Sequence, residues 1–109
     1  MRAERAKGAR AEREVIAIIR DAGWPAVRRT SDGRNQTGRG DVANGPAGCH
    51  LEVKRHERLN VPKALTQLRQ DAAALDIPVL VHRPSRSPWM ATLPLDELLA
   101  LLALREITP

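Results

Sequence analysis

One strand with strictly alternating side chains, running from Cys49 to Lys54, constrains the fold of this chain most strongly. Successive side chains of a β-strand point to opposite faces of the sheet. The apolar side chains at positions 49, 51 and 53 can therefore enter a core only if Glu52 and Lys54 project together from the other face, with His50 beside them. The sequence thus predicts a sheet with one apolar face and one face that gathers charge.

A second acidic residue precedes this strand at a short distance. Asp41-Val42-Ala43, followed by Asn44-Gly45, has the composition of a strand that ends in a turn. If this segment folds back as a hairpin, Asp41 comes to lie beside Glu52, and two carboxylates and the Lys54 ammonium converge. Oxygen ligands of this kind suit a hard cation such as Mg²⁺. An exposed charge pattern for Glu52 and Lys54, and a turn-opening role for Asp41, are the alternatives that spacing leaves open.

Length and charge set the class of protein and of partner. A chain of 109 residues is expected to form a single domain over residues 1–109, with a core built without Tyr or Phe. A formal charge of +5 favours a polyanionic partner, with nucleic acid first and an acidic membrane surface second.

The single cysteine, Cys49, excludes an intrachain disulfide and a cysteine-based zinc cluster. The histidines lack ligand spacing, and His50 is expected to be a solvated strand residue. The chain contains no apolar segment long enough to span a membrane and no signal-peptide pattern, which predicts a cytoplasmic protein without a membrane partner.

The first helix carries the least expected acid. Ala9–Ala22 is predicted to be an amphipathic helix, with residues 1–8 flexible before it. Glu12 falls inside the apolar arc, where a carboxylate requires a cation or an arginine partner. Glu14 falls on the opposite side and is predicted to be an ordinary surface charge. The predicted core residues of this arc are Ala11, Val15, Ile16, Ile18, Ile19 and Ala22.

The remaining elements complete an α/β pattern. A strand over Ala26–Ser31 precedes a glycine-rich loop, Asp32–Gly40, whose arginines and amides have phosphate-binding chemistry. A helix capped by Asn60 is predicted to run to Leu75 with Leu75 on its core side. The later elements are strands at Pro78–Arg83 and Trp89–Leu93 and a helix at Pro94–Leu104. This order predicts helices flanking one mixed β-sheet of about five strands.

Three segments resemble a known family. Lys7–Glu14 is similar to the opening helix of the PD-(D/E)xK nucleases, Gly40-Asp41-Val42 to their metal-binding aspartate, and Leu51–Lys54 to their E-x-K strand. Within that superfamily the chain resembles the small Holliday junction resolvases of archaea and their phage-borne relatives. Gly40 stands where the motif has proline, and Ser31 is the candidate for the serine that resolvases place before the aspartate.

The resemblance implies a restriction-endonuclease-like core, Mg²⁺ as cofactor with Mn²⁺ as substitute, and cleavage that leaves a 5′-phosphate. The implied catalytic residues are Glu12, Asp41, Glu52 and Lys54. The metal ligands would be Asp41, Glu52, Glu12 and the Val53 carbonyl. Predicted DNA contacts are Arg10, Arg28, Arg29, Ser31, Arg34, Arg39, Arg55, Lys63 and Gln67.

These features predict a hydrolase: a metal-dependent endodeoxyribonuclease that resolves four-way DNA junctions during recombination. It would act as a homodimer in a bacterial, archaeal or phage-infected cell. A restriction-type or repair nuclease of the same fold is one alternative. A non-catalytic DNA-binding module is the other.

Overall fold

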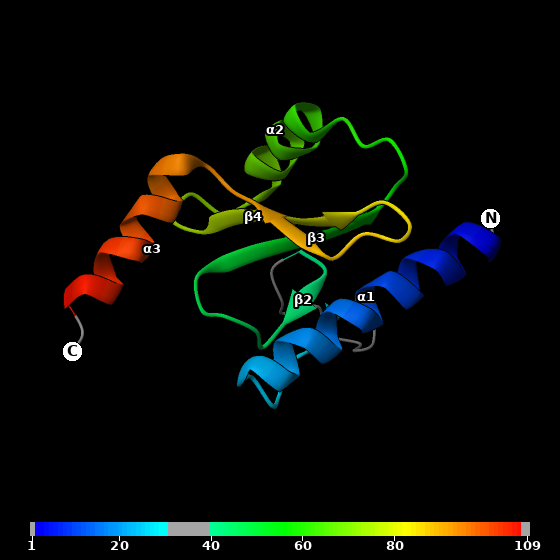
Figure 1. The fold of residues 1–109 in the computed structure, drawn as a ribbon, viewed down its shortest axis with the longest axis horizontal. Coiled ribbons are helices and arrows are strands. Elements are labelled where there is room, and N and C mark those ends of the chain that lie inside the picture. The colour runs from blue at the N-terminus through cyan, green and yellow to red at the C-terminus, as the bar shows by residue number, and fades with distance from the viewer. Residues whose placement is uncertain (1, 31–39, 108–109) are drawn as a thin grey trace.

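Residues 2–30 and 40–107 are described by a computed structural model and contain three α-helices and five strands (Figure 1). In chain order the elements are α1 (Arg2–Ala22), β1 (Arg28–Arg29), β2 (Val42–Ala43), β3 (Cys49–Arg55), α2 (Val61–Asp71), β4 (Ile77–Arg83), β5 (Met90–Thr92) and α3 (Leu95–Ile107). The α/β class predicted from the sequence is confirmed. The first helix begins at Arg2, seven residues before the predicted Ala9.

The strands form two sheets. β3 pairs with β4 in parallel and β4 with β5 antiparallel, which gives a mixed three-stranded sheet in the order β3-β4-β5. β1 and β2 form a separate antiparallel pair of two residues each. The predicted single sheet of about five strands is therefore wrong. β2 is short because Asn44 adopts a left-handed φ of 59°, which ends the extended backbone directly after Ala43.

The predicted hairpin between the Asp41 segment and β3 is also wrong. β2 pairs with β1, and Gly40 rather than β2 contacts β3, through an isolated bridge to Leu51. The segment that carries Asp41 therefore crosses the edge of β3 briefly instead of running along it. Asp41 still reaches β3, by the contacts described below.

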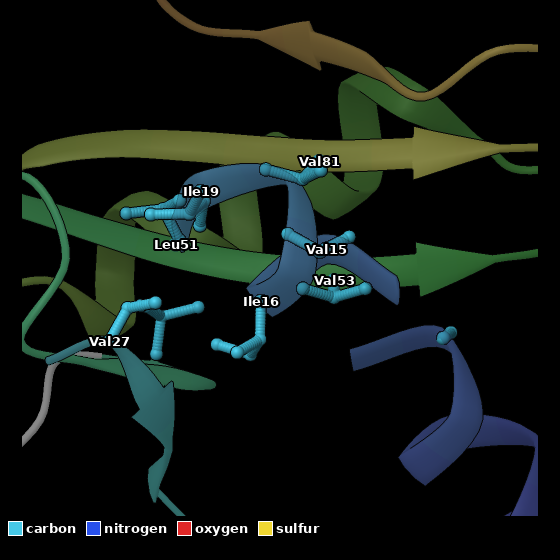
Figure 2. Close-up of a cluster of buried hydrophobic side chains, with 9 residues drawn as sticks. Val15, Ile16, Ile19, Val27, Leu51, Val53 and Val81 are labelled. Carbon is cyan, nitrogen blue, oxygen red and sulfur yellow. The ribbon is translucent and has the colours of Figure 1, made fainter. Parts of the chain in front are cut away.

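The alternation predicted for β3 is confirmed by the core. Leu51 and Val53 are buried against one face of α1, and Val81 of β4 lies beside them. Figure 2 shows the α1 side chains Val15 and Ile19 meeting this face of the sheet. Leu80 alternates with Val81 and is fully buried on the other face, where α2 packs and contributes Leu68. Because Glu52 is the register partner of Leu80, its side chain points toward the α2 side.

Three residues predicted to be buried are exposed, and one of them is Ala22, the last residue of α1. Leu75 is 96% exposed because α2 ends at Asp71 and Ala72 is extended, so helical periodicity no longer governs its direction. Ile18 is 51% exposed because the part of α1 that carries it lies beside β5, which is only three residues long. The N-cap of α2 is as predicted, with the Lys63 backbone N–H donating to the Asn60 side chain over 3.1 Å.

Glu14 is not an ordinary surface charge, contrary to the sequence-based prediction. It forms an ion pair with Arg83 at 2.9 Å and accepts a hydrogen bond of 3.2 Å from the Trp89 indole. The Arg83 guanidinium also lies 5.0 Å from the centre of the Trp89 ring. These partners come from the end of β4 and the loop after it, so the periodicity of α1 alone could not place them. The cluster ties α1 to the three-stranded sheet.

We expect Glu14→Gln to reduce stability more at pH 7 than at pH 3. The hydrogen bond and charge of Arg83, with the Trp89 hydrogen bond, lower the pKa of Glu14 below its ordinary 4.5. A lowered folded-state pKa contributes stability above pH 4.5 that disappears as the pH falls through the folded value. Because the side chain is 41% exposed, we expect a loss of about 1 kcal/mol, measured by urea unfolding. An equal loss at both pH values would contradict the ionic contribution.

No helix in residues 2–30 and 40–107 is long and apolar enough to cross a membrane.

Candidate active site

Asp41 is held at the edge of β3 that β4 leaves open. Its backbone N–H donates to the Leu51 carbonyl over 2.8 Å, and the Val53 backbone N–H donates to its Oδ2 over 2.8 Å. Thr30 adds a hydrogen bond from its hydroxyl to the Gly40 carbonyl at 2.9 Å. Two backbone groups of the same strand thus fix both the main chain and the carboxylate of Asp41. Glu52 lies between those two positions of the strand.

Gly40 is required by the backbone at this edge. Its φ is +75°, and a Cβ built on it would overlap the Leu51 carbonyl oxygen that receives the Asp41 N–H. Proline, which the related motif carries, is fixed near a φ of about −65° and cannot adopt this conformation. The glycine here is therefore a conformational requirement rather than a neutral replacement.

We expect Gly40→Ala to destabilise the fold by at least about 2 kcal/mol and to displace Asp41. Gly48→Ala is a matched control, because Gly48 has nearly the same φ of 74° and no atom within 4 Å of a built Cβ. Thermal unfolding of both variants separates the strain of the left-handed φ from the overlap with Leu51. Equal losses in the two variants would show that the overlap is relieved at no cost.

Glu52 and Lys54 line one cleft between β3 and α2. The cleft has a volume of about 270 Å³, and Lys63, Gln67 and Asp71 face it from successive turns of α2. Its remaining lining residues are His56, Leu59, Asn60, Ala64 and Leu68. This lining combines apolar and charged side chains, so a polar group entering the cleft would meet both carboxylates and ammonium groups beside apolar surface.

Burial and repulsion between carboxylates raise the pKa values of the two acids in this site. Burial, together with the charge of Asp41 and weaker repulsion from Asp71 and Glu12, raises the pKa of Glu52 to about 7. Burial also raises the pKa of Asp41, although the Val53 N–H and the Lys54 charge act against this rise. Lys54 lowers the pKa of both acids, yet Glu52 remains far above its ordinary 4.5. Burial is the main cause of both raised pKa values and repulsion from neighbouring carboxylates adds to it, a combination that is typical of functional carboxylates.

His50 lies beside Glu52. The sequence predicted a solvated side chain at this position, and that prediction is wrong. Its side chain is 13% exposed, and its Nε2 lies 4.0 Å from Glu52 Oε2. The alternation of β3 placed His50 on the site face, but only the surrounding structure shows that it is covered there.

Glu12 has the arginine partner that the sequence left open. Arg29 Nε donates to Glu12 Oε1 over 2.8 Å, and both side chains are largely buried. The charge of Glu12 still raises the pKa of Asp41 and Glu52, so it lies within electrostatic reach of them. The metal-ligand role suggested for Glu12 stays a prediction. The carboxylate that would bind the metal already accepts a hydrogen bond from Arg29.

The oxygen atoms of the site determine whether it can hold a metal ion. Among the described residues, no three or more His, Cys, Asp or Glu side chains are grouped to hold one. Asp41 and Glu52 supply carboxylate oxygens, and the Val53 carbonyl would be a third oxygen. Asp41 and Glu52 are half-buried, and their carboxylates and the Val53 carbonyl are all hard oxygen donors, so the set fits Mg²⁺ chemically.

The predicted DNA contacts fall in different places. Lys63 and Gln67 lie in the cleft, and Gln67 donates to Asp71 over 3.3 Å. Arg10 is exposed on α1, whereas the half-buried Arg28 donates to the neighbouring Arg29 carbonyl. Arg29 pairs with Glu12 as described. The predicted contacts Ser31, Arg34 and Arg39 lie outside the described residues.

Sequence reasoning missed two groups beside the site. Asp71 stands four residues after Gln67, so the spacing of Lys63 and Gln67 on α2 would have placed it on the same face. A second pocket, of about 280 Å³, adjoins Lys54 and is lined by Lys7, Arg55 and His56 among others. No local pattern brings Lys7 to the end of β3; only the packing of α1 does so.

No family model, no curated protein and no solved structure matches this chain.

Proposed function

We propose that the protein is a divalent-metal-dependent endodeoxyribonuclease with a restriction-endonuclease-like core, acting on branched DNA. The observation that carries this proposal is the hydrogen bond from the Val53 N–H to Asp41 Oδ2, which holds the Asp41 carboxylate next to Glu52 and Lys54. That arrangement joins the three residues of the family-like motif although no hairpin connects them. If Asp41 and Glu52 were only part of an exposed charge pattern, they would not need to be buried together.

The chemistry follows from the charges of the site. A phosphodiester resists hydrolysis partly because its own charge repels hydroxide. Mg²⁺ held by Asp41, Glu52 and the Val53 carbonyl would acidify a water molecule and offset charge on the phosphate. Lys54 lines both the cleft beside Glu52 and the basic pocket of Lys7 and Arg55, so its ammonium can contact a phosphate between them and orient the attacking water.

The basic pocket suggests the path of the nucleic acid. Lys7 and Arg55 line the basic pocket beside Lys54, Lys63 lines the cleft, and His56 lines both. Glu57 and Glu14 are the nearby acids, and each is engaged, by Ser85 and by Arg83 respectively. Consecutive phosphates of one strand could therefore contact cations on both sides of the scissile bond.

A four-way junction is the proposed substrate. Its resolution requires two cuts, so we propose that a homodimer supplies two sites. Cellular or phage DNA as substrate would place the protein in the cytoplasm.

Cleavage assays test the proposal directly. Purified protein is incubated with a four-way junction, a linear duplex of the same sequence and a single strand, each with Mg²⁺, Mn²⁺ or EDTA. Symmetrical cutting of the junction, lost in EDTA and in Asp41→Asn, is the expected result. Equal cutting of linear duplex would indicate a restriction-type or repair nuclease. Binding without cleavage under every metal would leave a DNA-binding module.

A further inference from the structure

Helix α3 exposes apolar side chains around its whole circumference. None of its residues is buried, and α3 has no extensive packing partner among the described elements. In Figure 1 it extends away from both sheets. The exposed large aliphatic residues include Leu95, Leu98, Leu99, Leu101, Leu102 and Ile107. A helix that is apolar on all sides normally lies in an interior, so α3 is a surface that requires a cover.

The same chain carries a second uncovered apolar surface. A groove of about 190 Å³ lies between α1 and β5, because the short β5 leaves part of the sheet face open. Its lining is entirely apolar: Val15, Ile18, Ile19, Leu51, Val81, Trp89, Met90 and Ala91. Ile18 and Met90, at 51% and 55% exposed, form its rim.

We propose that α3 of one molecule docks in the α1–β5 groove of a second copy, and that the second copy docks reciprocally. Both surfaces belong to every chain, so a pair of identical molecules covers two helices and two grooves with one twofold arrangement. A helix of 13 residues is about 20 Å long. This inference does not depend on the nuclease proposal.

Charge complementarity favours the same occupant. α3 carries Asp96, Glu97 and Glu106 against Arg105 alone, a net charge of −2. The whole chain has a net charge of +5, so the remainder carries +7. An acidic, apolar helix is therefore attracted to the basic body of another copy. It is repelled by an acidic membrane surface, and it is too short to span a bilayer.

Oligomeric state is the first test. We expect light scattering after size exclusion to give a dimer for the intact protein at micromolar concentration. Leu99→Glu with Leu102→Glu on α3, or Met90→Glu in the groove, should give monomers with unchanged circular dichroism. Leu75→Glu is the matched control, because Leu75 is 96% exposed but lies in neither surface. A monomeric intact protein, or a dimer that resists both sets of substitutions, would overturn the proposal.

Disulfide trapping identifies the occupant of the groove. In a Cys49→Ala background, one chain carries Ile18→Cys and another carries Leu102→Cys, and the two are mixed and oxidised. We expect a heterodimeric crosslink. A chain with both cysteines that closes on itself as a monomer would show that α3 covers its own groove instead. Flotation of the intact protein with lipid vesicles would point to a membrane surface and would also refute the proposal.

Discussion

Lys54→Ala is expected to reduce junction cleavage by roughly 10²–10³-fold while leaving junction affinity nearly unchanged. Lys54 is the lysine shared by the cleft beside Glu52 and the basic pocket, and its charge acts against the raised pKa values of both Asp41 and Glu52. Its loss removes a charge at the reacting phosphate, whereas many other cations contribute to binding. Single-turnover cleavage and gel-shift titration on the same junction measure the two effects separately.

Arg55→Ala is the matched control for this variant. Arg55 adjoins Lys54 on β3 but lines only the basic pocket, where it donates to the Ser85 hydroxyl over 3.2 Å. We expect weaker binding with a smaller salt dependence and near-normal cleavage of bound junction. Near-normal cleavage by Lys54→Ala would refute the proposed site, whatever the behaviour of Arg55→Ala.

Glu52→Gln is expected to stabilise the metal-free protein at pH 8 by on the order of 2–3 kcal/mol while it abolishes cleavage. Burial and the Asp41 charge raise the pKa of Glu52 from 4.5 to about 7. Between pH 4.5 and about pH 7, the Glu52 carboxyl loses its proton in the unfolded chain but retains it in the folded protein. Stability is therefore lost as the pH rises through this window, and the full cost is present above pH 7. Glutamine keeps the shape without the charge.

Thermal unfolding across pH tests this expectation. The advantage of Glu52→Gln should be large at pH 8 and small at pH 4, and Mg²⁺ should raise the Tm of the intact protein but not of the variant. Asp21→Asn, at an exposed carboxylate of α1, provides the control and should change neither the stability at pH 8 nor the effect of Mg²⁺ on the Tm. A constant advantage at all pH values would mean that packing rather than charge explains the stabilisation.

The local elements of the fold were accessible from the sequence. The alternation of Leu51 and Val53 with Glu52 placed the buried and charged faces of β3 correctly, because a strand has a period of two. The Asn60 cap located the start of α2 for a similarly local reason. By contrast, β2 was assigned to the wrong neighbour, since the composition of a two-residue strand does not identify its partner.

The candidate site, like the fold, was predicted only in part from the sequence. Asp41, Glu52 and Lys54 were named from one motif, and the proximity of Asp41 to β3 was expected. The way in which Asp41 approaches β3 was not expected. Its side chain accepts a hydrogen bond from Val53 across an open sheet edge, and no hairpin joins the two segments. Asp71 and Lys7 enter the site from helices whose packing no local pattern specifies.

The sequence by itself therefore determined which side chains of β3 face the core and which acids are candidates for chemistry, because these follow from local geometry and from residue type. Only the tertiary structure decided which charges meet. It paired Glu12 with Arg29, bound Glu14 to Arg83 and Trp89, and left both α3 and an apolar groove between α1 and β5 exposed. Each of these depends on the contact between elements far apart in the chain, which helix and strand periods do not encode.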